Sequence, residues 1–482
     1  MSQPATKRIV IEPVTRVEGH GKVTLLLDAD NRVEQARLHI VEFRGFERFV
    51  QGRPFWELPV LVQRLCGICP VSHHLCAAKA LDGLVGADRL PPTAEKMRRL
   101  MHYGQMFQSH TLHFFHLASP DLLFGFDAPV AKRNVLGVLA AHPDLAVQVV
   151  AMRRFGQEIV LATAGKKIHG TGAIPGGINK NLSLAERDAL LVQLPKMLDG
   201  ARTAVGLARD YTLSNLGSIA GFGSFVSNHL SLVRADGAMD LYDGKLRAIA
   251  PDGARILDQV DPADYLDVIA EEVRPWSYMK FPYLKRLGAA EGWYRVGPLA
   301  RVNACDSIDT PEAEAARRDF FASLGGGPVQ ATMAYHWARM IELLHAGEVI
   351  ARLLEDPDLQ GDELVAPAGE RRFESVAMIE APRGTLTHHY RIDENDQVVM
   401  ANLIVSTTCN NEAMNRAVRK IADDELSGKP VITEGLLNRI EVGIRAYDPC
   451  LSCATHALGQ MPLEVTLLDA EGREVDRREK SS

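Results

Sequence analysis

Alternating apolar and polar positions predict short β-strands near both ends of the chain. Two runs, Lys22–Asp28 and Val33–Ile40, flank a polar turn and predict a β-hairpin. A second hairpin is predicted over Thr385–Val405, around the polar turn Asp393–Asp396. The stretch Leu463–Val475 has a similar strand–turn–strand pattern, but one similarity of this length does not establish a repeat.

In the middle of the chain, apolar positions recur every three or four residues, which is typical of helices. This spacing holds over Pro92–Phe155 and predicts a helix bundle with an interruption near Ser119–Asp121. A capping-box signature, Ser183-Leu-Ala-Glu186, opens a further helix that we expect to end near Asp210.

Two more helices are predicted towards the C-terminus. Thr310 precedes a proline at a first helical position, and this helix is expected to reach Leu354 with breaks at Gly325–Pro328. Another helix is predicted over Asn410–Asp424. Helix therefore dominates the middle of the chain, and sheet lies towards its two ends.

Composition limits the classes of protein that the chain can represent. Its 482 residues are many for one domain, yet no Ser/Gly-rich tract, charge block or low-complexity linker divides them, so we expect one continuous catalytic body. A hydrophobic fraction of 46% with 24% charged residues is ordinary for a soluble globular protein. The net charge of −7 and the scattered basic residues argue against nucleic acid as a partner.

Targeting patterns and cysteine usage bear on the compartment. No apolar run of about 18 residues or more appears, and Met1–Val14 lacks the charged-then-apolar pattern of a signal peptide. Seven cysteines, an odd number, fit reduced thiols better than a disulfide framework. We therefore expect a cytoplasmic protein with no membrane anchor.

Two Cys-x-x-Cys pairs at opposite ends of the chain carry the most specific chemistry. Cys66 and Cys69 form one pair, and Cys450 and Cys453 form the other. Soft thiolates favour nickel, copper(I), zinc or iron over magnesium or calcium. The long separation disfavours a zinc ribbon, but spacing alone leaves open a four-cysteine zinc site, a rubredoxin-like iron, a redox dithiol and a mixed-metal centre.

The residues around the two pairs carry a resemblance to a known family. Arg64-Leu-Cys-Gly-Ile-Cys-Pro-Val-Ser-His73 and Asp448-Pro-Cys-Leu-Ser-Cys-Ala-Thr-His456 resemble the paired signatures of nickel-iron hydrogenase large subunits. The Pro-Val-Ser-His-His74 continuation is most similar to the cytoplasmic, bidirectional NAD-reducing branch. Further matching motifs cover nearly the whole chain: Arg16–His20, Phe43–Glu47, His169–Gly177, Gly297–Arg301 and Glu380–Gly384.

The resemblance implies a helix-rich α+β fold with a central helix bundle and small peripheral β-sheets. It also implies that Cys66 and Cys450 bind nickel terminally, while Cys69 and Cys453 bridge nickel and an iron that carries carbon monoxide and cyanide. Such a centre cleaves or forms dihydrogen heterolytically, which needs a Lewis-acidic metal and a nearby base that takes the proton.

Several residues match the family's proton-handling and charged positions. Cys450 is the implied base, and Glu18 matches the carboxylate that first accepts the proton and passes it outward. Arg383 matches a guanidinium that lies over the metals. Asp121 and Asp448 match the acids that orient this guanidinium, and bidentate pairing would explain acids at both positions.

Other matches concern the surroundings of the metals. His73 would donate a hydrogen bond to a bridging sulfur. Pro382 lies in the segment above the metals, and Ser406 and Thr407 align with hydroxyls that bind a cyanide ligand, with Thr407 preferred. Here the sequence departs from the commoner family pattern, because Cys409 stands where a tryptophan is usual.

A magnesium ion is also implied. Glu47 and His456 match its ligands in the family, and a backbone carbonyl near Leu403 is a third candidate. The Gly-rich stretch His169–Gly177 lacks the spacing of a phosphate-binding loop, so we expect NAD to bind elsewhere.

Partner subunits follow from the supply of cysteines. The three outside the pairs, Cys76, Cys305 and Cys409, are too few and too scattered for an iron-sulfur cluster, and we assign them no chemistry. The resemblance implies an iron-sulfur small subunit, and in the NAD-linked branch a diaphorase module that carries FMN, further iron-sulfur clusters and the NAD site. The alternatives are a hydrogenase linked to NADP, a deazaflavin or another carrier, and a regulatory hydrogen sensor.

The end of the chain predicts processing. Residues Ala457–Ser482 follow His456, and in the family a similar extension marks a precursor. An endopeptidase removes it after nickel-insertion chaperones have delivered the metal, here between His456 and Ala457. The resemblance thus divides the chain into a catalytic domain at 1–456 and a removable extension at 457–482. The alternative is a surface β-hairpin that stays attached.

Overall fold

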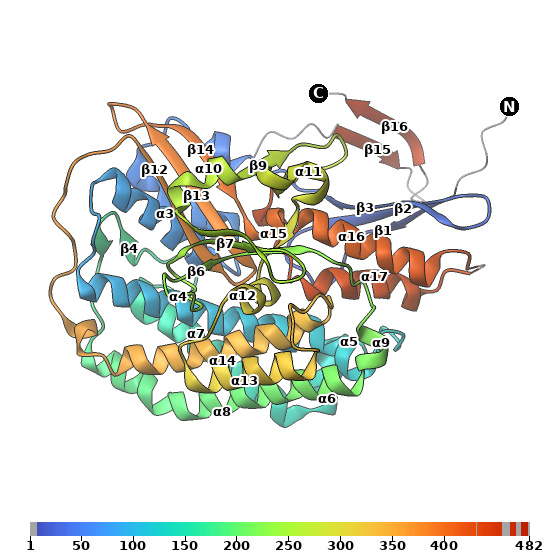
Figure 1. The fold of residues 1–482 in the computed structure, drawn as a ribbon, viewed down its shortest axis with the longest axis horizontal. Helices are drawn as coiled ribbons and strands as arrows, with labels where there is room; N and C mark the ends of the chain where they lie inside the picture. The colour runs from blue at the N-terminus through green and yellow to red at the C-terminus, as the bar shows by residue number, and fades with distance from the viewer. Residues whose placement is uncertain (1–6, 430, 456–462, 469–473, 481–482) are drawn as a thin grey trace.

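The computed structural model describes residues 7–429, 431–455, 463–468 and 474–480. Long helices form one half of the molecule, and small sheets with shorter helices form the other half (Figure 1). This arrangement confirms the predicted helix-rich α+β class with a helix bundle and small sheets.

Long helices packed side by side build the bundle. Helix α4 packs against α7 and α14, and α14 also packs against α8 and α13 (Figure 1). The capping box that opens α8 is confirmed, because the Ser183 side chain accepts from Glu186 N and the Glu186 side chain accepts from Ser183 N. The bundle helices are α4 (Pro92–Leu112), α7 (Pro143–Ala164), α8 (Leu184–Ser214), α13 (Pro311–Ser323) and α14 (Ala334–Leu354).

The predicted interruption near Ser119–Asp121 is wrong. Helix α4 continues through a π-helical segment, His113–Ala118, into α5 (Ser119–Phe124). Pro120 is tolerated because it directly follows the π-helical segment, where the Ser119 hydroxyl donates to the Phe115 carbonyl at 2.5 Å in place of a backbone N–H. The break comes later, at Gly125 with φ +87°, and α6 (Val135–Ala141) follows it.

Three sheets of three or four strands surround the site. Both predicted hairpins are confirmed, and each gains a strand that the sequence pattern did not predict: β1 joins the first and β12 joins the second. The first sheet has the order β1 (Lys7–Ile11), β2 (Gly21–Leu27), β3 (Val33–Ile40), and the second the order β12 (Glu374–Ala381), β13 (Gly384–Ile392), β14 (Val398–Ile404). A mixed sheet has the order β11 (Tyr294–Arg295), β6 (Asn228–Val233), β7 (Lys245–Ile249), β8 (Arg255–Val260).

Shorter elements connect these layers. Helix α3 packs on β12 and β13, and α16 packs on β3 and α17. The shorter helices include α1 (Phe46–Phe49), α2 (Leu58–Leu61), α3 (Pro70–Leu84), α9 (Leu216–Ile219), α10 (Tyr265–Val268), α11 (Gly288–Glu291), α12 (Pro298–Ala304), α15 (Ser406–Cys409), α16 (Asn411–Ile421) and α17 (Glu434–Ala446). Paired strands are β4 (Ala173–Ile174) with β5 (Gly177–Ile178), β9 (Ile269–Glu272) with β10 (Phe281–Leu284), and β15 (Leu463–Leu468) with β16 (Glu474–Lys480).

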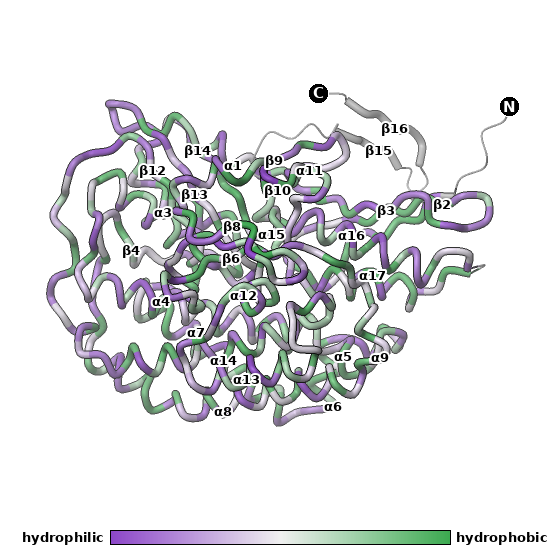
Figure 2. Tube along the Cα trace, in the orientation of Figure 1, coloured by the Kyte–Doolittle hydropathy of each residue, from purple (hydrophilic) through white to green (hydrophobic). Residues whose placement is uncertain are grey.

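The hydrophobic core extends from the helix bundle to the sheets. No single long apolar segment of the described residues builds it. Helix α14 is buried along most of its length, including the charged side chains Arg339 and Glu342. Hydrophobic and hydrophilic residues intermingle along the helices (Figure 2). Within the described ranges, no helix combines the length and apolar character needed to cross a membrane.

Candidate metal centre

A backbone contact beside the cysteines joins the N-terminal and C-terminal regions. Leu451 N donates to the Glu18 carbonyl at 2.9 Å, and Glu18 and Cys450 form an isolated parallel bridge. Glycine is required beside it, because Gly19 has φ +80° and an added Cβ would lie 2.6 Å from Ser452 N. This contact holds the C-terminal cysteines against the loop that follows β1.

The two cysteine pairs converge as the sequence predicts. Cys66 and Cys69 lie in the turn before α3, and Cys450 and Cys453 lie in the turn after α17. Cys450 Sγ is 3.1 Å from Cys66 Sγ and 3.0 Å from Cys453 Sγ, while Cys69 Sγ is 3.9 Å from Cys453 Sγ. All four buried sulfur atoms lie within 4.8 Å of one another, the only such group of potential metal ligands among the residues that the structure describes.

Electrostatics distinguish the four thiols. Burial opposes ionisation of Cys66, but hydrogen bonds from the other three thiols and the charge of Arg383 hold the pKa of Cys66 well below its ordinary value. Burial raises the pKa of Cys450 and of Cys453 well above the ordinary value, and neighbouring sulfur adds to the effect. The pocket therefore favours ionisation of Cys66 and opposes ionisation of Cys450 and Cys453, which the positive charge of a bound metal would offset.

Glu18 is in direct contact with the cluster. The thiol of Cys450 donates to Glu18 Oε2 at 2.9 Å, and Ser452 N donates to the same oxygen at 3.2 Å. The Ser452 hydroxyl donates to Glu18 Oε1. Burial raises the pKa of Glu18, and the nearby Cys66 thiolate raises it further. The carboxylate is thus held in place to accept a proton from sulfur.

Arg383 reaches the cluster from the turn between β12 and β13. Its Nη2 donates to Asp448 Oδ1 at 3.0 Å, and both side chains are buried. Burial alone would lower the pKa of Arg383, but Asp448 and the cysteine thiolates hold it well above its ordinary value. Its Nε and Nη1 are buried with no hydrogen-bond partner among the described residues. Two donor nitrogen atoms beside the sulfurs are therefore available to a ligand.

The predicted contact of Asp121 with Arg383 is wrong. Asp121 Oδ1 accepts from Arg16 Nη2 at 2.6 Å, and its Oδ2 accepts from Arg445 Nη1 at 2.9 Å. Each carboxylate oxygen thus already accepts from a guanidinium, so Asp121 pairs with Arg16 and Arg445 instead of Arg383. Asp121 acts instead on the segment behind the site, because the Arg445 carbonyl accepts from Asp448 N at 3.0 Å.

A small cavity adjoins the sulfurs. It measures about 10 Å³, roughly the space for one water molecule, so it admits only a very small molecule. Its lining brings together seven of the predicted site residues: Cys69, His73, Pro382, Arg383, Ser406, Thr407 and Cys450. An eighth, Asp448, is hydrogen-bonded to Arg383.

Two hydroxyls at this cavity differ in their hydrogen bonds. The Ser406 hydroxyl donates to the Gly384 carbonyl at 2.7 Å, so its one proton is used. Thr407 Oγ1 accepts from Cys450 N at 3.0 Å, which leaves its proton for a further acceptor. This difference favours Thr407 as a donor to a ligand.

Comparison with known proteins decides the family. Residues 44–132 and 252–456 match the family described as nickel-dependent hydrogenase, and residues 8–43 match one described as HoxL-like. The chain belongs to the nickel-dependent hydrogenase family. The resemblance carried by its motifs is thereby confirmed.

Individual relatives match over nearly the full length. The NAD-reducing hydrogenase HoxS subunit beta of Cupriavidus necator is 53% identical, over 98% of this chain and 99% of the relative. An F420-non-reducing hydrogenase chain of Methanothermobacter marburgensis is 42% identical, also over 98% of this chain and 99% of the relative. A crystal structure of an NAD⁺-reducing [NiFe]-hydrogenase superposes with a TM-score of 0.92 at 58% identity, over 94% of this chain and 100% of the solved chain.

A buried ion network holds the turn that carries Arg383 in this hydrogenase-family chain. Arg301 on α12 donates to both oxygens of Glu342 at 2.6 Å and to Glu380 Oε2 at 2.7 Å. It also donates to the Ala381 carbonyl at 2.9 Å. The side chains of all three charged residues are fully buried. Arg301 therefore fixes the end of β12 immediately before the Arg383 turn.

Glycines complete this support. An added Cβ on Gly297, at φ +94°, would lie 2.7 Å from the Arg383 carbonyl, and one on Gly384 would lie 2.3 Å from Val296. The motif Gly297–Arg301 thus supports the Arg383 turn through one glycine and one guanidinium. The sequence analysis assigns this motif no role. The occurrence of a glycine and an arginine in one short motif was the signal that could have indicated a structural role.

The predicted magnesium ligands are only partly described. Glu47 is partly buried on α1, and its Oε1 accepts from Leu403 N at 2.8 Å. Lys280 Nζ lies 3.9 Å from the same oxygen. Burial raises the pKa of Glu47, and Lys280 offsets part of that rise. His456 lies outside the described residues.

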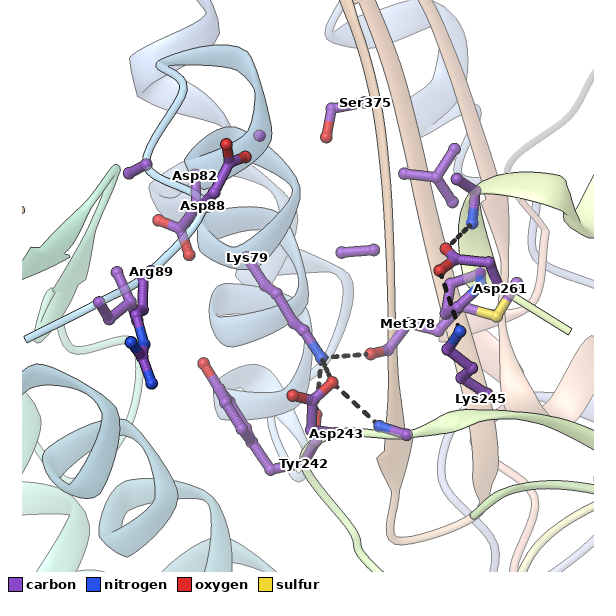
Figure 3. A pocket seen from close by; sticks show the side chains of 18 of the residues that line it. Lys79, Asp82, Asp88, Arg89, Tyr242, Asp243, Lys245, Asp261, Ser375 and Met378 are labelled. Atoms are coloured by element: carbon purple, nitrogen blue, oxygen red, sulfur yellow. Dashed lines mark hydrogen bonds and ion pairs between the residues drawn. The ribbon is translucent and has the colours of Figure 1, made fainter. Parts of the chain in front are cut away.

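A larger cavity lies away from the cysteines. It measures about 860 Å³ between α3, β12 and the segment around Tyr242 (Figure 3). Its charged groups pair with one another: Lys79 Nζ donates to Asp243 Oδ1 at 2.7 Å and to the Met378 carbonyl at 3.3 Å, and Lys245 pairs with Asp261. Cavity size alone therefore does not locate the candidate centre.

The ion network predicts a large cost for removing Arg301. We expect Arg301→Met to destabilise the chain by about 3–5 kcal/mol, because Glu342 and Glu380 would remain buried without their counter-charge. The measurement is the shift of the denaturant unfolding midpoint. Arg202→Met is the matched control, because Arg202 makes a similar two-oxygen pair with Glu312 that is largely exposed. Its expected cost is about 0–1 kcal/mol, and equal costs for the two variants would contradict this account.

Proposed function

We propose that this chain is the catalytic large subunit of a hydrogenase that cleaves or forms dihydrogen at a nickel-iron centre. Electrons then pass through an iron-sulfur partner subunit and on to NAD. The convergence of four buried sulfur atoms from two remote Cys-x-x-Cys motifs carries this proposal. The names of the relatives and of the solved structure support NAD as the carrier.

The donor set fits the proposed metals. Cys66 and Cys450 would bind nickel terminally, and Cys69 and Cys453 would bridge nickel and an iron with carbon monoxide and cyanide ligands. When bound, the centre supplies a Lewis-acidic site for dihydrogen and takes up its two electrons. Four buried thiols fit soft metals of this kind and would not suit magnesium or calcium.

Glu18 moves the proton in this proposal. The Sγ–H bond of Cys450 breaks and an O–H bond forms at Glu18 Oε2, which leaves a Cys450 thiolate. Glu18 returns to a carboxylate when it passes the proton outward, and the thiolate regains a proton from the next dihydrogen. The 2.9 Å separation places donor and acceptor within direct transfer distance. Ser452 keeps the carboxylate oriented by donating to both of its oxygens.

Arg383 and its neighbours line the small cavity beside the sulfurs. The guanidinium places positive charge beside the sulfurs, and Asp448 fixes its orientation. Its unpartnered Nε and Nη1, with the hydroxyl of Thr407, offer donors to cyanide nitrogen atoms, and Pro382 closes the same cavity. Asp121 supports Asp448 through Arg445 rather than through Arg383.

Magnesium remains part of the proposal. Glu47, His456 and a backbone carbonyl near Leu403 would hold the ion. What supports this is the position of Thr455, whose carbonyl accepts from Arg44 N and Gly45 N immediately before α1. Thr455, which precedes His456 in the sequence, is thereby joined to the turn before the helix that carries Glu47.

The proposed partners and compartment follow the NAD-linked relatives. We propose a cytoplasmic complex in which the chain joins an iron-sulfur small subunit and also a diaphorase module with FMN. The competing electron carriers are NADP and a deazaflavin. Supplying dihydrogen to the purified complex and measuring which carrier is reduced distinguishes them from NAD. A hydrogen-sensing role is the remaining alternative, and a tail that is removed after metal insertion argues against it.

Metal content tests the proposal directly. We expect Cys450→Ser in the full complex to lose most of its nickel and its dihydrogen-dependent NAD reduction, because one of four ligands is removed. Cys76→Ser is the matched control: Cys76 is buried on α3, donates to the Ala377 carbonyl and lies outside the cluster. Elemental analysis and an activity assay measure both variants. Full nickel in Cys450→Ser, or zinc alone in the wild type, would refute the proposal.

Removing the proton acceptor should separate chemistry from metal binding. We expect Glu18→Gln to reduce hydrogen–deuterium exchange from labelled dihydrogen by about 10²–10⁴-fold, because an amide cannot accept the proton. Nickel content should stay unchanged. Glu12→Gln, at a largely exposed carboxylate near Lys22, should leave the exchange rate intact. An unaltered exchange rate in Glu18→Gln would exclude it as the acceptor.

The C-terminal extension is proposed to be removed. The family match ends at residue 456, and the solved relative is matched in full by 94% of this chain, which supports cleavage by a nickel-dependent endopeptidase after nickel-insertion chaperones have acted. We expect intact-mass spectrometry to find residues 1–456 in nickel-replete cells and residues 1–482 in nickel-starved cells. Active enzyme that retains the tail would contradict this division of the chain.

A further inference from the structure

A chain of hydrogen bonds leads from His73, beside the cysteine cluster, into β13 through two residues, His388 and Tyr390, that have no role above. His73 Nδ1 lies 3.2 Å from His388 Nε2, and His388 Nδ1 lies 2.7 Å from the hydroxyl oxygen of Tyr390. All three side chains are buried. His73 stands on the first turn of α3, whereas His388 and Tyr390 project from the same face of β13, two residues apart.

The donors and acceptors in this chain can be assigned from Tyr390. Its hydroxyl has a single proton, and the hydrogen-bond partner that the described residues provide is His388 Nδ1. Donating to that nitrogen satisfies the buried proton, whereas leaving it undonated would be costly. His388 Nδ1 must then be the acceptor, so the proton of the neutral His388 ring is on Nε2.

The same reasoning passes to His73. His388 Nε2–H donates to His73 Nδ1, which therefore carries no proton. A ring whose Nδ1 carries no proton is neutral and keeps its one proton on the other nitrogen. Its single proton is then on Nε2, on the side of the ring away from His388. His73 lines the small cavity together with Cys69 and Cys450.

We propose that Tyr390 and His388 are positioning residues that lock His73 in its Nε2-protonated tautomer, so that His73 presents an N–H donor to the metal-binding sulfurs. This inference rests on the proposed function. A donor to a thiolate withdraws charge from the sulfur and so changes the electronic state of any metal it binds. Tyr390 thus acts on the centre through two intervening side chains, His388 and His73, and does not contact the sulfurs itself.

The chain contains a natural control for this arrangement. Tyr265 Oη lies 3.0 Å from His389 Nδ1, a second buried Tyr–His pair on the adjacent residue of β13. Because side chains alternate along a strand, His389 projects from the opposite face to His388. It pairs with Glu374 rather than with a residue at the cluster. Tyr265→Phe therefore removes a similar hydrogen bond away from the metals.

The test compares Tyr390→Phe with Tyr265→Phe in the assembled, metal-loaded complex. Infrared spectroscopy of the carbon monoxide and cyanide ligands is the main readout, because their stretching bands report the charge on the iron. We expect Tyr390→Phe to shift these bands and to lower turnover by about tenfold, and Tyr265→Phe to change neither. In a His73→Gln background, Tyr390→Phe should cause no further shift, since the donor it controls is gone.

The outcomes separate this inference from the proposed function. Wild-type complex without these infrared bands would refute the nickel-iron proposal itself. Wild-type bands that stay unmoved in Tyr390→Phe, or that move equally in Tyr265→Phe, would overturn the tautomer lock alone. An additive shift in the double variant would also overturn it, because Tyr390 would then act by another route.

Discussion

The structure depends on one approach of backbone to backbone, at Glu18 and the Cys450 turn. Their bridge brings the C-terminal thiols onto the loop after β1, beside the N-terminal thiols at the start of α3. Gly19 makes the approach possible because any side chain there would meet Ser452 N. The same contact places the Glu18 carboxylate within hydrogen-bond distance of the Cys450 sulfur, so one contact positions both the proposed metal ligands and the proposed proton acceptor.

The charged side chains near the sulfurs are buried, and each therefore needs an oppositely charged partner close by. Arg383 pairs with Asp448, Asp121 pairs with Arg16 and Arg445, and Arg301 pairs with Glu342 and Glu380. Ion pairs of this kind add little net stability, but each partner becomes indispensable once the other is buried. They fix the direction of side chains at the site, and Asp448 holds its position with a left-handed backbone at φ +54°.

The sequence was most informative where the pattern was long or chemically distinctive. Helix α8 could be predicted from its period and its capping box, and the four metal ligands from two Cys-x-x-Cys spacings with their flanking motifs. Strands β1 and β12 could not be, because each gains its stability by pairing with the hairpin that follows it in the sequence rather than from its own alternation. Pro120 suggested a break because its place in a first turn depends on the π-helical segment before it.

Within the site, the residue types were predictable but their partners were not. Asp121 was expected at Arg383, yet Arg16 and Arg445 reach it from sequence separations of 105 and 324 residues. Local sequence holds no signal for such pairings. Arg301 stood inside a recognised motif and His388 and Tyr390 inside a predicted hairpin, and their roles emerged only from the hydrogen-bond donors that surround the site.

X-ray absorption at the nickel edge of the assembled, active complex tests the central claim most directly. The account predicts a nickel ion whose ligands are mainly sulfur, with iron as a close neighbour, since four thiolates converge on one point. Nickel surrounded by nitrogen and oxygen, or the absence of nickel from turnover-competent protein, would contradict it.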